Sequence, residues 1–202
     1  MKNKKSRGFT LIELLVVIAI IAVLSVVVIL TLNPAELLRQ SRDSNRISDL
    51  STMKNAISLF ESDVDTSSVS ALGTYGVLYT GSFGTSTTIT DPNTYIGGAP
   101  AWGYASTSVV SVATSTSRAL DGTGWIPVSF SLISSGAPID NEPIDPINDN
   151  VYYYTYVASG TVFKFASKLE SIKYNQGGFN DSVSTDGGNS SDTLESGTEL
   201  DL

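Results

Sequence analysis

The sequence predicts an α+β protein in which a long N-terminal helix packs on a small antiparallel β-sheet with long loops. Three observations support this class. An apolar run at residues 9–32 can cross a membrane, a helical amphipathic pattern follows at 33–62, and short alternating segments separated by Gly, Ser and Pro fill 63–202. We therefore expect one helix whose first half spans a membrane, followed by one soluble domain.

Residues 9–32 are the most apolar stretch of the chain. Between Leu14 and Leu30 only Ser25 interrupts the apolar residues. As a helix the run extends about 36 Å, which exceeds a hydrocarbon core of about 30 Å. Its many Val and Ile residues would favour a strand in water. In lipid, however, every backbone polar group must be paired within the segment, so we predict a membrane-spanning helix.

One acidic side chain, Glu13, stands inside this run. An acid within a membrane segment is costly and is a functional residue by default. No cation follows within a turn or two, and Arg7 precedes the break at Gly8. If the chain is cut after Gly8, the new α-amino group of Phe9 becomes the available cation. A neighbouring copy displaced along a shared axis can supply that amine, so we interpret Glu13 as an assembly residue.

The leader at 1–8 and the start of the apolar run form one motif. The leader carries four positive charges, and the residues that follow read Gly8-Phe9-Thr10-Leu11-Ile12-Glu13-Leu14-Leu15. This run resembles the cleavage and methylation motif of type IV prepilins and type II secretion pseudopilins. The resemblance implies a pilin-like fold, cleavage between Gly8 and Phe9 by a membrane aspartyl peptidase, N-methylation of Phe9, and use of Glu13 for register in a helical filament.

The same resemblance implies a structural subunit of a type IV pilus or a type II secretion pseudopilus. Its implied partners are identical or homologous pilin subunits, the prepilin peptidase and the assembly machinery of the cytoplasmic membrane. Because the basic leader should stay inside, we expect a single-pass precursor with its N-terminus in the cytoplasm and an extracytoplasmic filament after assembly. The alternative is a membrane-tethered binding or adhesion module that does not polymerise. The sequence does not separate a pilus from a pseudopilus.

The composition limits which functional groups and partners the soluble part can use. The chain has 12 basic and 20 acidic residues, a net charge of −8, and no His or Cys. Loss of the leader leaves 8 basic residues and a net charge of −12, which argues against nucleic acid as a partner. Disulfides, imidazole bases and most zinc sites are excluded. The acids Asp140 and Glu142 lie in a proline-rich turn without a pocket signature, so we do not expect an enzyme.

The second half of the helix begins at a break. Asn33 either caps a new helix with Pro34 at its first position, or Pro34 kinks one continuous helix. The residues that recur every three or four positions predict an apolar stripe that packs on the sheet: Ile47, Leu50, Met53, Ile57, Phe60 and Val64.

The opposite face of this amphipathic helix is polar. It carries five charged residues: Arg42, Asp43, Arg46, Asp49 and Lys54. Two interpretations remain open for them. The Arg and Asp side chains pair between packed helices of a filament, or they form a solvated face.

The soluble domain divides into three parts. Residues 63–124 are a variable loop region with Trp102 and Tyr104 as anchors, 125–170 hold the β-sheet, and 171–202 form an acidic tail that is either disordered or tied down. Short strands are expected in the loop region at Tyr75–Thr80, Thr87–Thr90 and Ser108–Ala113. The clearest hairpin pairs Val151–Val157 with Thr161–Ser167, and places Phe163 and Phe165 toward the helix.

Calcium is the one cofactor that the sequence suggests. The oxygen-bearing residues of the loop and the tail are Asp145, Asn148, Asp149, Asp181, Asp186, Asn189 and Asp192. Carboxylate and amide oxygens are the ligands that calcium prefers, and the pseudopilins that this chain resembles bind calcium in their C-terminal loops. No EF-hand spacing is present. The competing interpretation is turn chemistry, in which Asp and Asn bond their own backbone.

Overall fold

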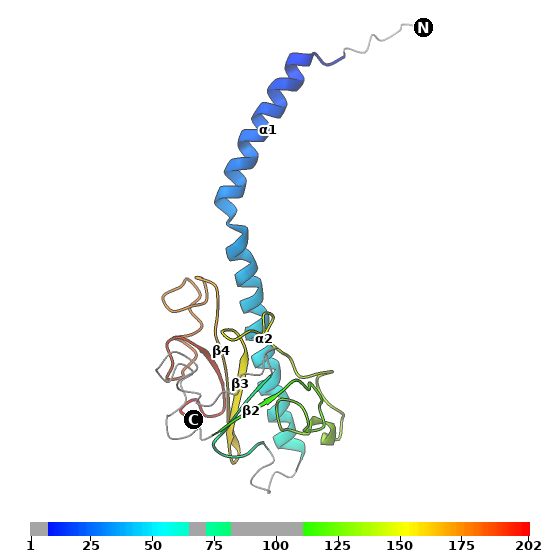
Figure 1. Cartoon of the computed structure of the whole chain (residues 1–202), viewed down its shortest axis with the longest axis vertical. Helices are drawn as coiled ribbons and strands as arrows, with labels where there is room; N and C mark the ends of the chain where they lie inside the picture. Colours follow the sequence, from blue (N-terminus) through cyan, green and yellow to red (C-terminus); the bar gives the residue numbers. More distant parts are fainter. Residues whose placement is uncertain (1–7, 65–71, 82–110) are drawn as a thin grey trace, which may run out of the picture. The chain divides into compact units, whose positions relative to one another are not determined.

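The computed structural model describes residues 8–64, 72–81 and 111–202 (Figure 1). Residues 1–7 of the leader, the expected strand Thr87–Thr90 and the expected anchors Trp102 and Tyr104 lie outside the described residues. The chain divides into two units, residues 1–38 and 39–202, and each is considered separately.

The break predicted at Asn33 separates two helices. Helix α1 covers Leu11–Leu32 and α2 covers Pro34–Asp63. Asn33 adopts a left-handed backbone (φ 40°) and ends α1, and its carbonyl accepts the N–H groups of Glu36 (3.0 Å) and Leu37 (3.3 Å) in the first turn of α2. Pro34, which has no N–H to satisfy, occupies the first helical position. The first of the two sequence interpretations is therefore confirmed.

The sheet has five strands in the order β2-β1-β3-β4-β5. These are β1 (Val77–Gly81), β2 (Ser111–Ser115), β3 (Tyr154–Ser159), β4 (Val162–Ser167) and β5 (Leu194–Gly197). The β1–β2 pair is parallel and the others are antiparallel. The sheet is therefore mixed, not wholly antiparallel as predicted. A parallel pair needs a long crossover, and the connection from β1 to β2 is long enough to provide one.

The predicted hairpin is confirmed with a shifted start. Strand β3 begins at Tyr154 instead of Val151, because the Asp149 carboxylate accepts the N–H groups of Val151 and Tyr152, each at 2.8 Å, and holds them in a turn. Phe165 lies opposite Tyr156 in the ladder, and the turn uses Gly160 with φ 64°.

The core forms between α2 and one face of the sheet. The predicted stripe supplies Leu50, Met53, Ile57 and Phe60, all buried. Tyr156, Phe163 and Phe165 from the hairpin join the same cluster, as predicted for the two phenylalanines.

The segment 125–153 was expected to be part of the sheet but contains no strand. Its apolar run is irregular, with a short 3₁₀ helix, η1 (Phe130–Leu132). Pro127 lacks a ladder donor, and the N–H of Ile126 is bonded to Glu142. The run still buries Trp125 and Phe130 in the core.

The acidic tail is tied to the sheet. Strand β5 pairs with β4, and the buried Lys164 of β4 forms an ion pair with Glu195 of β5. The Lys164 ammonium also donates to the carbonyl of Leu200 (2.6 Å). A four-residue strand that contains a buried acid gives no apolar alternation, which explains why the sequence did not predict it.

Charged residues on the polar face of α2 are paired inside the chain. Arg46 is fully buried, and its guanidinium binds the Asp145 carboxylate through Nε (2.6 Å) and Nη2 (2.9 Å). Its Nη1 donates to Asp43 (2.8 Å) and Glu170 (2.6 Å). Neither sequence interpretation holds for Asp43 and Arg46, because they contact neither solvent nor another helix of a filament.

Further bonds complete this cluster, which we call the Arg46 cluster (Arg42, Asp43, Arg46, Asp145 and Glu170). Arg42 makes a two-point contact with Glu170, at 2.8 and 2.5 Å. Asp43 accepts the backbone N–H groups of Glu170 and Ser171. Burial opposes the charge of Glu170, but the two arginines outweigh it and lower its pKa. Burial likewise opposes the charge of Arg46, and the carboxylates raise its pKa. The cluster ties α2 to two loops.

We predict that Arg46→Met lowers the free energy of unfolding by about 3–5 kcal/mol, because removing one partner leaves buried carboxylates without their cation. Urea denaturation of the full chain in detergent, followed by tryptophan fluorescence, measures the loss. Arg42→Met is the matched control. The Arg42 side chain is 32 % exposed, so its loss should cost about 1 kcal/mol. Equal losses in both variants would contradict a central role for Arg46.

Candidate functional site

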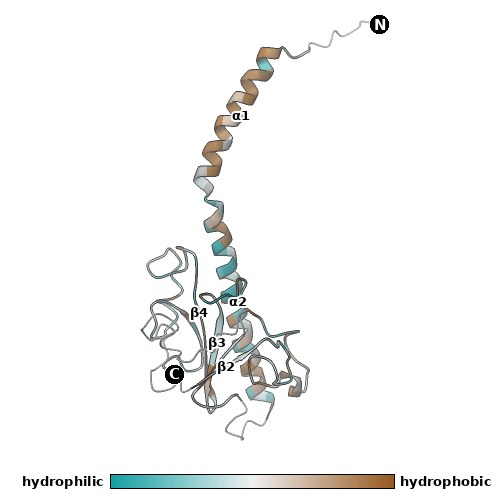
Figure 2. Ribbon diagram, in the orientation of Figure 1, coloured by the Kyte–Doolittle hydropathy of each residue, from teal (hydrophilic) through white to brown (hydrophobic). Residues whose placement is uncertain are grey.

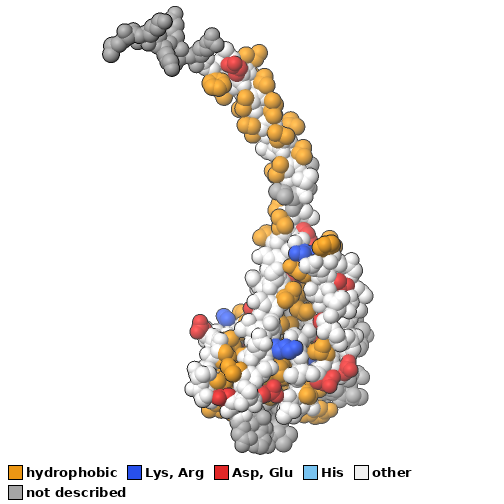
Figure 3. All heavy atoms as spheres, turned by 180° about the vertical axis from the view of Figure 1, so that it is seen from behind, with side chains coloured by type: hydrophobic (Ala, Val, Ile, Leu, Met, Phe, Trp, Pro, Cys, Tyr) orange, Lys and Arg blue, Asp and Glu red, His pale blue; other side chains and the backbone are white. Residues whose placement is uncertain are grey.

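Helix α1 is apolar on all its sides. Leu11–Ile29 has a mean hydropathy of 3.2, and none of these residues is buried. Figure 2 shows the contrast with α2, which mixes hydrophilic and hydrophobic residues, and Figure 3 shows hydrophobic side chains along the visible face of α1. By length and composition it is the one helix among the described residues that can cross a membrane. An all-round apolar helix needs lipid or other helices around it.

Polar groups within α1 are satisfied locally. The Ser25 hydroxyl donates to the carbonyl of Ile21 (2.7 Å), and the Thr31 hydroxyl donates to that of Val27 (3.0 Å). Hydroxyls bonded to the preceding turn do not require water. Neither side chain therefore opposes an apolar environment around the helix.

The helix begins at a capping box. Thr10 is the N-cap, with φ −81° and ψ 151°, and its hydroxyl accepts the N–H of Glu13 (3.3 Å). The Glu13 carboxylate in turn accepts the N–H and the hydroxyl of Thr10, each at 2.8 Å and both on Oε2. Gly8 and Phe9 precede the helix, and Phe9 is 89 % exposed. The Gly8–Phe9 bond is therefore accessible and outside the helix.

The capping box gives Glu13 a role that the sequence reasoning missed. We interpreted Glu13 as an acid whose cation must come from a second subunit, but Thr10 already binds it within one chain. The spacing Thr10-x-x-Glu13 before an apolar run is the signal that identifies such a cap. The carboxylate also lies near the positive end of the helix dipole. Its use in assembly stays a prediction.

The calcium candidates in the loop are engaged by the protein itself. Asp145 binds Arg46, and its Oδ1 also accepts the N–H groups of Ile147 (2.8 Å) and Asn148 (3.2 Å). Asn148 has a left-handed backbone (φ 50°), and Asp149 closes the turn before β3. These contacts match the turn chemistry that was the competing interpretation.

The tail candidates are engaged in a similar way. Asp186 accepts the N–H groups of Gly188 (2.9 Å) and Glu195 (2.6 Å), and Asp181 accepts those of Gly177, Val183 and Ser184. Asp192 is exposed. Within the described residues no three acids come together as a metal site. Calcium binding therefore stays a prediction without a donor cluster to support it in this part of the chain.

The acids Asp140 and Glu142 lie in different environments. Asp140 is exposed, whereas Glu142 is fully buried. Glu142 Oε2 accepts the N–H of Ile126 (3.1 Å), and Arg118 donates to the backbone carbonyl of Glu142 (2.5 Å), not to its carboxylate. Burial raises the pKa of Glu142 to about 7, against the opposing effect of backbone N–H groups.

Comparison with known proteins bears on the N-terminal region alone. Residues 3–29 match the family model of the prokaryotic N-terminal methylation motif. This motif is the signal carried by type IV prepilins and pseudopilins, and it is processed by prepilin peptidase. It covers residues 3–8 of the leader, the Gly8–Phe9 bond, the capping box and most of α1. No curated protein and no solved structure matches the chain.

The raised pKa of Glu142 predicts a pH-dependent stability. An acid whose folded pKa is about 7 and whose ordinary value is 4.5 stabilises the fold fully below pH 4.5, and this contribution is lost as the pH rises through 7. The shift corresponds to about 3 kcal/mol. Glu142→Gln stays neutral, so its unfolding free energy should decline less than that of the wild type between pH 5 and 8.

Urea denaturation of the full chain at several pH values measures this difference. Asp140→Asn, at the exposed neighbouring acid, is the control and should follow the wild type. Parallel curves for Glu142→Gln and the wild type would show that Glu142 does not hold its proton in the fold.

Proposed function

We propose that this chain is made as a prepilin and becomes a structural subunit of a type IV pilus or a type II secretion pseudopilus. The observation that carries the proposal is the coincidence of the methylation motif with an exposed and predominantly apolar helix. The methylation motif includes the N-terminal end of α1, and the apolar surface of α1 needs lipid or other helices around it along its whole length.

The precursor crosses the cytoplasmic membrane once, with the basic leader on the cytoplasmic side. Hydrolysis of the Gly8–Phe9 peptide bond releases the leader and leaves a positively charged α-amino group on Phe9, which is then methylated. The accessible position of this bond before the N-cap supports the step. The helix then moves from lipid to a bundle of identical helices, where close packing replaces contacts with acyl chains.

Glu13 can serve both the single chain and the filament. Both bonds from Thr10 end on Oε2, so Oε1 can accept the Phe9 amino group of a neighbour. The cap thus orients the carboxylate before the neighbour arrives. In an apolar bundle, the positively charged amino group of Phe9 and the negatively charged carboxylate of Glu13 attract each other far more strongly than they would in water.

A second function has one observation in its favour. Because the capping box explains Glu13 without a neighbour, the helix could be only an anchor for a tethered binding module. That function requires the leader to be retained and the protein to be monomeric in detergent.

We predict that the mature protein begins at Phe9 with a methylated amino group, as measured by intact mass and N-terminal sequencing. Gly8→Val is the matched variant. A side chain built at Gly8 meets no atom within 4 Å, so the fold should be unchanged while recognition by the peptidase is lost. A wild-type protein that retains Met1 would overturn the proposal.

Three variants separate the cap from the charge at Glu13. Glu13→Gln keeps an N3 side chain that can cap but removes the charge. It should lower filament yield about tenfold or more, since loss of one partner of a buried charge pair costs at least 2 kcal/mol. Thr10→Ala keeps the charge and loses a cap worth about 1 kcal/mol, so it should still assemble.

Glu13→Ala loses both functions and should assemble least. Yield is measured as sheared or sedimented filaments relative to total protein. If Glu13→Gln assembles like the wild type while Thr10→Ala fails, the residue is a cap only, and its role in assembly is refuted.

A further inference from the structure

Two exposed apolar side chains are carried by adjoining parts of one loop, residues 171–182, which we call the Phe179 loop. Phe179 is 96 % exposed, more than any other large apolar side chain among the described residues, and Ile172 is 73 % exposed. The backbone of Gly178 packs against that of Ile172, since a Cβ atom at Gly178 would overlap the Ile172 carbonyl oxygen. The loop therefore presents Ile172 and Phe179 as one small apolar tip.

Hydrogen bonds within the Phe179 loop order its backbone. The N–H group of Asn180 donates to the carbonyl of Lys173 at 2.9 Å. The N–H group of Ser182 donates to the carbonyl of Tyr174, also at 2.9 Å. An apolar tip on a backbone that is already ordered loses little conformational entropy when it binds a partner.

The Phe179 loop (orange in Figure 1) lies at the end of the C-terminal unit where α2 enters it. The hydroxyls of Tyr174 and Ser44 share a hydrogen bond (3.3 Å), and Ser44 lies about 15 Å along α2 from Pro34. The last residue of α2, Asp63, instead accepts the N–H and the hydroxyl of Ser134. The two ends of α2 thus carry different loops, and the Phe179 loop belongs to the first.

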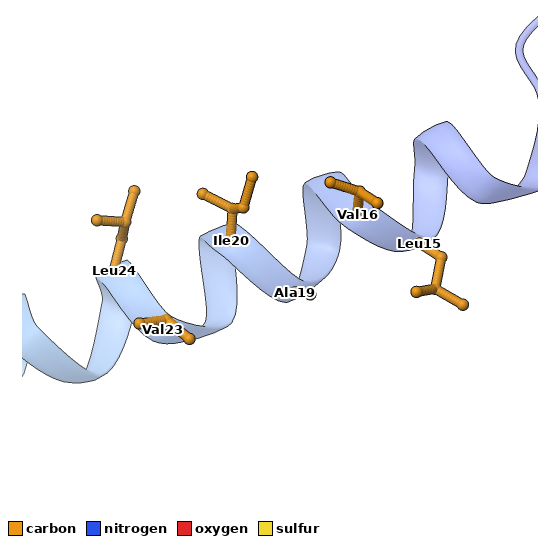
Figure 4. Close-up of a pocket in the computed structure, with 6 residues that line it drawn as sticks. All are labelled: Leu15, Val16, Ala19, Ile20, Val23 and Leu24. Carbon is orange, nitrogen blue, oxygen red and sulfur yellow. The ribbon is translucent and has the colours of Figure 1, made fainter.

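In a precursor that spans the membrane, lipid is nearest to this same end of α2. Only Asn33 separates the end of α1 from the start of α2, so the hydrocarbon around α1 ends close to Pro34. Figure 4 shows part of α1 with its aliphatic side chains: Leu15, Val16, Ala19, Ile20, Val23 and Leu24. Single-span helices tilt by about 20° on average, and such a tilt lowers one side of the attached unit toward the headgroups.

The polar groups of the Phe179 loop suit a membrane surface. The ammonium of Lys173 lies 4.6 Å from the centre of the Tyr174 ring. Lysine and tyrosine at a bilayer surface keep their polar ends among the headgroups while their apolar parts face the acyl chains. The one acid of the loop, Asp181, accepts the backbone N–H groups of Gly177 (2.7 Å) and Val183 (3.1 Å).

We propose that the Phe179 loop rests on the bilayer that α1 spans, with Phe179 and Ile172 inserted among phospholipid headgroups and Lys173 beside their phosphate oxygens. Lipid is selected as the occupant because α1 brings it to this end of every single chain, before a second copy is present. The inference requires only that α1 crosses a membrane, so it holds for a filament subunit and for a tethered module alike.

Fluorescent labelling tests the contact, because the chain has no cysteine of its own. Full-length Phe179→Cys and Ile172→Cys proteins are labelled with an environment-sensitive dye. They are reconstituted in vesicles of phosphatidylcholine and phosphatidylglycerol that contain a lipid with a nitroxide on its headgroup. The nitroxide should quench the dye at either position about threefold more than at Leu132→Cys, as expected for side chains inserted in the headgroup layer.

Leu132 is the matched control position. It is also an exposed apolar residue, at 63 %, but it belongs to η1, two residues before Ser134 at the far end of α2. A second pair of variants tests the tip itself. Phe179→Asp should lower the quenching of a dye at position 172 to the level seen at position 132, whereas Leu132→Asp should leave it unchanged. Urea denaturation checks that both variants stay folded.

Equal quenching at positions 132, 172 and 179 would overturn the inference. A dye at position 172 that is shielded from water only at high protein-to-lipid ratios would identify a second copy as the occupant and would also overturn it. Both outcomes leave the proposed function standing, since that function fails separately if the wild-type protein retains Met1.

Discussion

The C-terminal unit depends on how Arg46 is neutralised. Its guanidinium is fully buried, yet three carboxylates from three segments converge on it: Asp43 of α2, Asp145 of the proline-rich loop, and Glu170 after β4. A buried charge is tolerated only when its partners and hydrogen bonds are complete. This condition fixes the positions of two loops that have little regular structure.

In contrast to the C-terminal unit, helix α1 has no packing partner within the described part of the chain. The side chains of Thr10, Glu13, Ser25 and Thr31 form hydrogen bonds within the helix, in the capping box and to carbonyl groups of the preceding turn. What remains is apolar surface on every side. Such a helix is compatible with lipid and with a bundle of other apolar helices. The C-terminal unit completes its own core, whereas α1 requires a core supplied from outside.

Periodicity predicted the elements that depend on apolar burial. The α2 stripe at Leu50, Met53, Ile57 and Phe60, and the hairpin with Phe163 and Phe165, follow from spacing alone. The Arg46 cluster did not, because the sequence pattern of a charged helix face is the same whether the face meets water or is paired with acids 99 and 124 residues further along the chain. Strand β5 and the parallel β1–β2 pair depend on long connections that leave no local pattern. For the candidate site, the sequence identified Gly8, Phe9 and Glu13, but the cap at Thr10 was overlooked.

The capping box means that Glu13 has a partner within its own chain, but a role in assembly remains possible to test. A carboxylate in lipid with no partner would have required a neighbour, and the capping box removes this necessity. Yet a cap alone does not require a full charge, since a glutamine at the same position can serve. The full charge also interacts favourably with the positive end of the helix dipole. In the proposed function, a second partner of this charge is the Phe9 amino group of a displaced copy, which cleavage would create.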